Sequence, residues 1–247
     1  MDFGSILQTF LVGLVAGFIN ILAAGGSAIS VPFLIFLGLE PGIANGTNRV
    51  PILCQCFSAC LAYRKKVSIN YKKAFLYGLL MIPGSLAGVW MVAQVPSKTL
   101  QHILAVVVGI VALLTLLPSK KAKTTTKPSK KKELLFYFSL ILLSLYGGFL
   151  QIGLGFIFIA IFRYFTNASF VEISSYKAFV ILIYFIPLIF AFESKSLIHW
   201  PSALYMSAGN ISGAWIASKL AIAKGDRIIK FALAFALVLI MLKTFLG

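Results

Sequence analysis

Acidic side chains are scarce in this sequence of 247 residues. Asp and Glu together number six, and charged residues make up 11% of the chain, against about a quarter in ordinary soluble domains. All six lie at predicted termini or loops: Asp2, Glu40, Glu133, Glu172, Glu193 and Asp226. With no carboxylate inside an apolar segment, the chain has no evident means to bind a cation or to build a carboxylate proton relay within a membrane.

Cysteine and histidine are also few. Cys54, Cys56 and Cys60 share one apolar segment with no CxxC pair and no histidine partner, which argues against a metal site and favours a packing role. The sequence contains no Ser/His/Asp set, no metal-ligand cluster and no glycine-rich nucleotide loop in a soluble context. We therefore expect no enzyme activity, no metal and no cofactor.

Apolar residues, by contrast, make up 60% of the chain and recur in long blocks. The blocks cover roughly residues 5–39, 43–63, 74–95, 99–118, 134–166, 173–192, 201–223 and 228–246. About 20 residues of helix cross the hydrocarbon of a bilayer. The sequence therefore predicts an all-α integral membrane protein with several crossings.

The formal net charge of +16 would suggest nucleic-acid binding in a soluble protein, but its distribution indicates something else. Twelve of the 22 Lys and Arg residues lie in two loops, at residues 64–73 and 119–132. Short basic loops mark the cytoplasmic side of a membrane protein, and they also attract anionic lipids. We expect lipid contacts at these loops and no nucleic-acid partner.

The two halves of the chain resemble each other. The stretch "NILAAGGSAIS" matches "GGFLQIGLGFIF", which pairs Gly25 with Gly153, and "TNRVPIL" matches "SYKAFVI", which pairs Arg49 with Lys177. We predict an internal duplication with a first repeat at 1–118, a basic cytoplasmic linker at 119–133 and a second repeat at 134–247.

Each repeat begins with a helix that is broken by glycine. The piece from Ser27 to Gly38 has 12 residues, about 18 Å of helix, which is too short for about 30 Å of hydrocarbon. The block could be a hairpin that returns to the outside or a single broken span. The hairpin makes the two repeats inverted and places more basic residues inside, so we favour it; three transmembrane helices then follow in each repeat.

A helix that begins inside the membrane directs unpaired N–H groups and the positive end of its dipole inward, where they attract anions. In an inverted repeat, two such ends would converge near the midplane. Arg49 and Lys177 are each the one cation in an otherwise apolar segment, and snorkelling to the interface is the alternative for both. The predicted anion site consists of these cations and the groups around the breaks: Arg49, Lys177, Gly25, Gly26, Ser27, Thr47, Asn48, Gln151, Gly153 and Gly155. Gln151 could instead serve helix-to-helix hydrogen bonding.

Four stretches of the first half, "LVGLVAGFINILAAGGSAISVPFLIFLG", "ANGTNRVPIL", "YRKKVSINYKKAFLYG" and "IPGSLAGVWMV", resemble the sulfite exporter TauE/SafE family, and the second half resembles its duplicate. The resemblance implies a transporter in the plasma (inner) membrane of a prokaryote, for small sulfur-containing or organic anions such as sulfite or sulfonates, without a cofactor. Two features depart from the family: the glycine-rich break is reduced to "AAGGS" and "QIGLG", and Arg49 replaces the usual lysine.

We expect a secondary transporter that moves a small anion by alternating access around the cationic site. The alternatives are an anion channel and a non-transporting membrane scaffold or assembly factor. Saturable flux with counterflow separates a carrier from a channel, and a scaffold does not explain paired cations at paired helix breaks. The sequence leaves open which anion is carried, the direction of transport, the coupling ion and whether the chain forms a homodimer.

Overall fold

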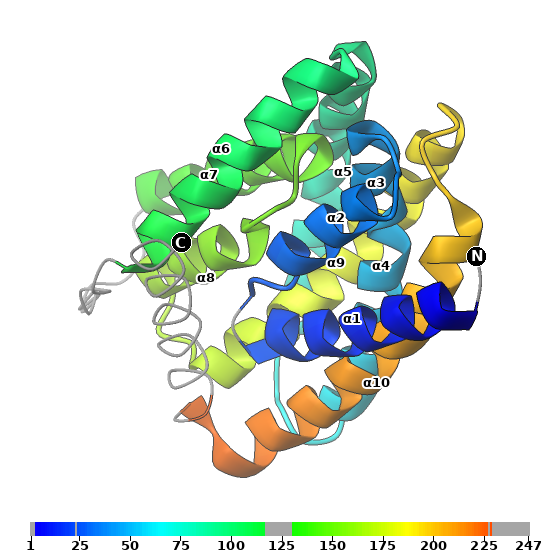
Figure 1. Cartoon of the computed structure of the whole chain (residues 1–247). Helices are drawn as coiled ribbons and strands as arrows, with labels where there is room; N and C mark the ends of the chain where they lie inside the picture. The colour runs from blue at the N-terminus through cyan, green and yellow to red at the C-terminus, as the bar shows by residue number, and fades with distance from the viewer. Residues whose placement is uncertain (1–2, 23, 117–129, 227, 229–247) are drawn as a thin grey trace.

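The computed structural model describes residues 3–22, 24–116, 130–226 and 228. These residues form ten α-helices and no strand (Figure 1). The helices are α1 (Phe3–Leu22), α2 (Ser27–Phe36), α3 (Pro41–Thr47), α4 (Arg49–Tyr63), α5 (Tyr71–Gln94), α6 (Ser97–Leu116), α7 (Lys130–Phe149), α8 (Leu154–Phe165), α9 (Phe170–Glu193) and α10 (Trp200–Lys224). The block expected at 228–246 lies outside the described residues, except for its first residue.

Both predicted breaks are present, between α1 and α2 and between α7 and α8. At each break one non-glycine residue takes a left-handed conformation, Ala24 with φ of 58° and Gln151 with φ of 65°. After the second break the chain turns back, because Phe136 near the start of α7 contacts Phe162 and Phe165 near the end of α8, with ring centroids 5.3 and 5.5 Å apart. The pair α7–α8 is therefore a hairpin and not a single broken span.

The block expected as one helix over 43–63 is interrupted at Asn48, where α3 ends and α4 begins. Pro51 explains the interruption, because proline has no N–H to offer the carbonyl four residues before it and its ring crowds that carbonyl. The turn places Asn48 and Arg49 at the first turn of α4, inside the protein, where both side chains are buried.

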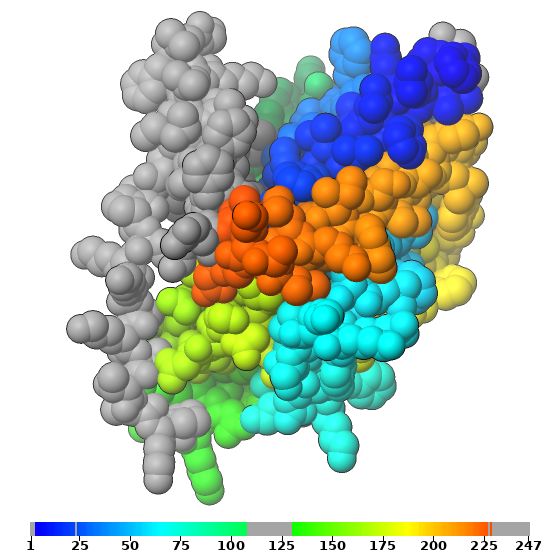
Figure 2. Space-filling model, turned by 90° about the horizontal axis from the view of Figure 1, so that it is seen from below, coloured from blue at the N-terminus to red at the C-terminus, as the bar shows by residue number. Residues whose placement is uncertain are grey.

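Glycines let two helix pairs pack at very short range. On α1, Gly13 and Gly17 lie directly against the backbone of Met206 and Asn210 of α10, and Figure 2 shows α1 and α10 side by side. On α7, Gly148 lies against the backbone of α5 in the same manner. Small residues spaced by four, as in GxxxG, are the usual means of close helix contact in membranes.

One end of the molecule, here called the basic end, gathers residues 64–73, 130–137, 163–176 and 224–226. Asn70 N–H donates a 3.0 Å hydrogen bond to the hydroxyl of Tyr176, and Val171 N–H donates one of 3.2 Å to Asp226. The Lys and Arg side chains in these segments are Arg64, Lys65, Lys66, Lys72, Lys73, Lys130, Lys131, Lys132, Arg163 and Lys224.

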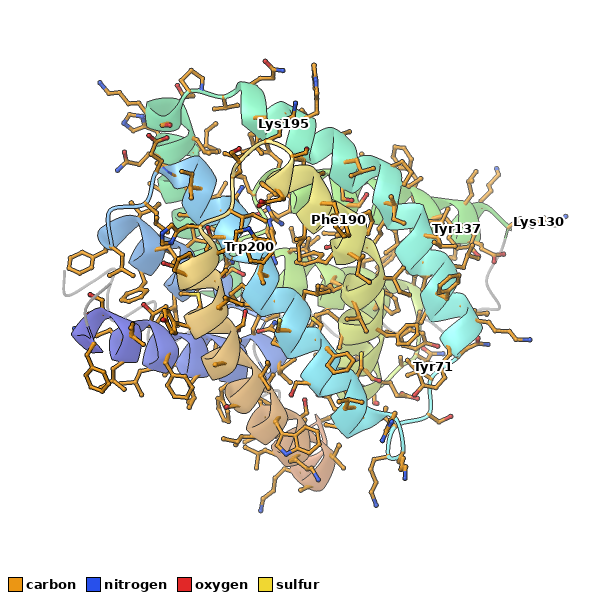
Figure 3. All side chains as sticks on the ribbon, turned by 90° about the vertical axis from the view of Figure 1, so that its right-hand side faces the viewer. Tyr71, Lys130, Tyr137, Phe190, Lys195 and Trp200 are labelled. Carbon is orange, nitrogen blue, oxygen red and sulfur yellow. The ribbon has the colours of Figure 1, made fainter. Side chains whose placement is uncertain are left out.

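The opposite end gathers residues 37–47, 95–100 and 193–202. The Ser97 hydroxyl lies 3.3 Å from a Glu40 carboxylate oxygen, and His199 N–H donates a 2.9 Å hydrogen bond to Thr47 Oγ1. Figure 3 shows Tyr71 and Lys130 toward one side of the view and Lys195 and Trp200 toward the other.

The first helices of the two halves, α1 and α7, run in opposite directions between these ends. Helix α7 starts at the basic end and runs alongside α5. Helix α1 runs parallel to α10, because Gly13 and Gly17 contact Met206 and Asn210 in the same order. Since α10 starts at the opposite end, α1 starts there too. These are the directions that an inverted repeat would have, and the repeat and its boundaries stay predictions. Most of the expected linker at 119–133 lies outside the described residues, and its last four residues already belong to α7, which begins at Lys130.

The surface is apolar in the manner of a membrane protein. Four of the described helices, α1, α5, α7 and α9, are long and apolar enough to cross a bilayer. Large apolar side chains project outward all along them, among them Leu7, Leu11, Val15, Phe75, Leu79, Trp90, Phe138, Leu142, Ile186 and Phe190. Because water would penalise such a surface and lipid would not, the fold is that of an all-helical integral membrane protein.

Candidate functional site

The guanidinium of Arg49 binds the C-terminal end of α7. Its Nη1 donates to the carbonyl of Gly147, and its Nη2 donates to the carbonyl of Gly148 at 3.3 Å. The last carbonyls of a helix have no partner within the helix, and they form the negative end of its dipole. A cation from the first half therefore caps a helix that ends inside the second half.

Asn45 completes this cap. Its Nδ2 donates to the carbonyl of Phe149 at 2.8 Å, while its Oδ1 accepts a 3.1 Å hydrogen bond from Nη2 of Arg49. Asn45 precedes Arg49 by four residues, a spacing that can place two side chains on the same face of a helix. Together the two side chains satisfy three consecutive carbonyls at the end of α7.

Two aromatic rings of α9 cover the guanidinium. The Cζ atom of Arg49 lies 4.9 Å from the ring centroid of Phe192 and 5.9 Å from that of Phe185. Both distances are within the range of a cation–π interaction. Arg49 is 0% exposed, so its charge is held entirely by protein groups in this conformation.

Lys177 repeats the same arrangement with the halves exchanged. It lies on α9 of the second half, is 3% exposed, and its Nζ donates a 2.8 Å hydrogen bond to the carbonyl of Asn20. Asn20 is in the last turn of α1, the counterpart of α7 in the first half. Each cation thus bridges the two halves and caps a broken helix of the other half.

These contacts differ from the sequence-based expectation. The two cations were expected at the N-terminal ends of the half-helices α2 and α8, but their hydrogen bonds go to the C-terminal ends of α7 and α1. Lys177 lies eight residues before Phe185 on α9, about 12 Å along the helix axis. In this conformation Arg49 therefore contacts the end of α7 and Lys177 the end of α1. A single anion site that both cations share stays a prediction.

Several buried hydrogen-bond donors near Arg49 have no acceptor among the residues that the structure describes. They are Nε of Arg49 itself, Nδ2 of Asn48 and the hydroxyl of Tyr184, which lies beside Gly147. The Oδ1 of Asn48 is already used, since it accepts a 2.7 Å hydrogen bond from Ser30 of α2. An unpaired buried donor costs about 1–3 kcal/mol, so this group of donors would favour an acceptor such as an anion.

The two breaks touch each other. A methyl group built on Gly155, at the start of α8, would lie 2.5 Å from Cβ of Ala24 in the first break. The expected convergence of the breaks is therefore present. The pairing within them shifts by one residue, because Gly26 and Gly153 are the residues that directly precede α2 and α8.

The remaining predicted residues lie inside the protein with separate roles. Gly25 is half-buried, and Gly26 packs closely against the carbonyl of Ala16 on α1. Ser27 and Gly153 are buried at the first and second break. Thr47 and Gln151 are buried as well. The Thr47 hydroxyl accepts the hydrogen bond from His199 N–H, just before α10. Oε1 of Gln151 has no hydrogen-bond partner among the described residues.

The site is closed in this conformation. Two open hollows on the described residues, of about 490 and 500 Å³, lie away from Arg49. One is lined by Lys131, Leu134, Leu135 and Phe138, and the other by residues of α4 and α10. A ligand would reach Arg49 or Lys177 only after the surrounding helices move.

No group of three or more His, Cys, Asp or Glu side chains that could hold a metal ion occurs among the described residues. The three cysteines are free, and they lie on α4 with Cys56 buried. Within the part of the chain that the structure describes, the chemistry of the interior is that of cations, amides, hydroxyls and helix ends.

Four features around the cations were missed by the sequence argument: Asn20, Asn45, the Gly147–Gly148 pair and the nearby hydroxyl of Tyr184. The contact between Asn45 and Arg49 could have been predicted from the sequence, because Asn45 lies one helical turn before Arg49. The glycine pair closes an apolar block, as a helix end would. Asn20 and Tyr184 gave no comparable signal, because their positions relative to the cations depend on the packing of distant segments.

Comparison with known proteins gives a consistent result. The family model described as Sulfite exporter TauE/SafE matches residues 9–244. The chain is 27% identical to the probable membrane transporter protein ORF9 of Sinorhizobium sp over 224 residues, which are 90% of this chain and 85% of the relative. It is 25% identical to the probable membrane transporter protein YfcA of Escherichia coli (strain K12) over 223 residues, 90% of this chain and 82% of the relative. No solved structure matches the chain significantly.

Proposed function

The chain belongs to the sulfite exporter TauE/SafE family and is a membrane transporter, and from this we propose that it exports a small anion, a sulfur oxyanion or an organosulfonate such as sulfite. The mechanism in this proposal is alternating access, in which a closed central site opens to one side of the membrane at a time. The site lies in the prokaryotic plasma membrane, within the contact region of the two halves.

The observation that carries the proposal is the buried guanidinium of Arg49 beside donors that lack acceptors. Nε of Arg49 and the hydroxyl of Tyr184 can each donate one hydrogen bond, Nδ2 of Asn48 can donate two, and all three groups are buried. Oxyanions are strong acceptors, and guanidinium groups bind them with short charge-assisted hydrogen bonds. A sulfite-like ligand would supply both the negative charge and the acceptors.

Lys177 adds a second buried cation, and Gly155 brings the start of α8 against the first break. In the proposed mechanism the breaks act as the points where α2 and α8 move relative to α1 and α7. In this mechanism, a closed state with both cation caps in place would lie between the two open states. Opening toward either side requires that one of the two cation caps be released.

The orientation in this proposal places the basic end in the cytoplasm. The Lys and Arg side chains of that end far outnumber Lys98 and Lys195 at the opposite end, as the positive-inside rule requires. Anionic lipid headgroups are the proposed contacts of residues 64–73 and of the start of α7.

The experiment is flux of radiolabelled sulfite into proteoliposomes that contain the purified protein. A carrier gives saturable uptake, and unlabelled sulfite on the inside accelerates entry of the label by counterflow. Linear, non-saturating flux without counterflow would indicate a channel instead. Absence of flux, together with absence of any sulfite-dependent or sulfonate-dependent melting shift in detergent, would reject anion transport and leave a scaffold role.

A further inference from the structure

The two buried cations differ in how completely their charge is satisfied. The guanidinium of Arg49 donates to three protein acceptors and lies over two aromatic rings. Within the described part of the chain, Lys177 has one hydrogen bond, to the carbonyl of Asn20. A protonated lysine has three N–H bonds to donate, whereas a neutral amine needs only one or two acceptors. The single bond at Lys177 therefore leaves two N–H bonds of an ammonium ion unpaired but only one of a neutral amine, so the neutral form is the better satisfied.

Among the described residues, no carboxylate is paired with Lys177. Cys56 of α4 is the titratable group in electrostatic contact with it, and α1 contributes the Asn20 carbonyl but no titratable side chain. Glu172, on the same helix, caps α9 by accepting from the backbone N–H of Ser169 at 2.7 Å. The titratable or charged side chains that α5 and α8 carry are near the basic end: Tyr71, Lys72, Lys73, Tyr77, Arg163 and Tyr164.

An ammonium ion at such a place is costly, because it has left water without gaining a counter-ion. Two events remove the cost: the ammonium ion can lose a proton and become a neutral amine, or an anion can bind beside it. The two events are linked, since an anion that favours the charged form must also be favoured by it. Arg49 cannot take part in this linkage, because a guanidinium keeps its proton in proteins.

We propose that Lys177 takes up one proton when the transported anion binds and releases it when the anion leaves, so that each anion moves together with one proton. The inference rests on the proposed transport function. The new N–H bond forms on Nζ, with the proton taken from the aqueous side to which the site is then open. The same proton leaves to the side on which the anion is released, and the amine returns to its bond with Asn20.

The experiment counts protons and sulfite in the same proteoliposomes. Radiolabelled sulfite reports the anion, and a trapped pH-sensitive dye reports the protons in weak buffer. The decisive variant is Lys177→Arg, which keeps a cation but cannot release its proton. Sulfite itself can carry a proton, but this contribution is common to parent and variant. We expect Lys177→Arg to retain net sulfite flux with one proton fewer per anion.

Two further variants serve as a charge-removing comparison and as a control. Lys177→Met keeps an unbranched side chain without the charge, and its sulfite flux should fall by about tenfold or more. Lys195→Met removes an exposed lysine from the α9–α10 connection and should keep both the flux and the proton count of the parent. If Lys177→Arg does not fold, Lys177→Met decides: retention of the parent flux and proton count in a folded sample overturns the proposal.

The outcomes distinguish the two claims. If the parent moves no sulfite, the transport function itself fails. If the parent moves sulfite and Lys177→Arg carries as many protons per anion as the parent, transport stands and the coupling role of Lys177 is wrong.

Discussion

Single replacements of Arg49 and Asn45 distinguish two roles of Arg49: capping the end of α7 and binding an anion. Arg49→Gln removes the donors to the Gly147 and Gly148 carbonyls, whereas Asn45→Ala removes the donor to the Phe149 carbonyl and one of the acceptors of Arg49, whose Nη2 keeps its hydrogen bond to Gly148. Each buried carbonyl left without a donor costs about 1–3 kcal/mol. We therefore expect Arg49→Gln to lower the free energy of unfolding by about 2–6 kcal/mol and Asn45→Ala by about 1–3 kcal/mol.

The same two variants should differ much more in anion binding. Arg49→Gln removes the positive charge, and a charge-assisted hydrogen bond contributes about 1.5–3 kcal/mol, so the loss of one such bond alone weakens binding by about 10- to 150-fold. Asn45→Ala leaves the charge in place and should bind sulfite within a few-fold of the parent. Arg49→Lys should bind more weakly than the parent, because it keeps the charge and loses the planar pair of donors.

The assay is the sulfite-dependent shift of the melting temperature in detergent, measured over a range of sulfite concentrations so that each variant yields an affinity. Lys72→Gln changes an exposed lysine at the basic end and serves as the control, with affinity expected to be unchanged. The reasoning is refuted if folded Arg49→Gln binds sulfite like the parent. It is also refuted if Asn45→Ala loses as much affinity as Arg49→Gln, because Arg49 would then act only through the helix cap.

Three other predictions follow from the arrangement of the helices. Single cysteines placed at the exposed residues Ser68 and Ser196, in a background without the native cysteines, should be labelled from opposite sides of the membrane, and equal labelling of both by an impermeant reagent would exclude the inverted topology. Gly148→Ala should destabilise the protein by about 1–3 kcal/mol in chemical denaturation, because the added methyl overlaps the backbone of α5, whereas Gly42→Ala, with its nearest neighbour at 3.5 Å, should be nearly neutral. Gly155→Ala should force the two breaks apart and lower sulfite flux, and parent-like flux would show that their contact is dispensable.

The predictable part of the fold is the part that depends on local composition. Long apolar blocks predicted the helices, and glycine within the first block of each half predicted the breaks, since glycine is a poor helix former and is tolerated at membrane depth only with internal partners. The interruption at Asn48 was missed because the block was judged by hydropathy, although Pro51 in the sequence indicates it. A one-residue shift in the pairing of the breaks was missed because short glycine stretches can be aligned in more than one way.

The partners of the cations could not be predicted in the same way. Arg49 was identified because a lone cation in an apolar segment must have a partner, but its partner Gly147 lies 98 residues away, and the partner of Lys177 lies 157 residues away. Only the packing of one half against the other brings these groups together. Helix-end carbonyls also leave no trace in the sequence, because every residue has one.

The reciprocal caps give a physical reason for one anion to change the conformation of the whole protein. A ligand shifts a conformational equilibrium only by the difference between its affinities for the two states. In the closed state the Nη atoms of Arg49 are engaged by carbonyls of α7, so an anion that needs them must compete with the cap. In a state where α7 has moved away, the same donors are free, and the anion binds them without competition. Under the proposed function, a bound anion would therefore favour the state in which the contact between the halves is released, because the anion supplies Arg49 with the acceptors that the end of α7 no longer provides.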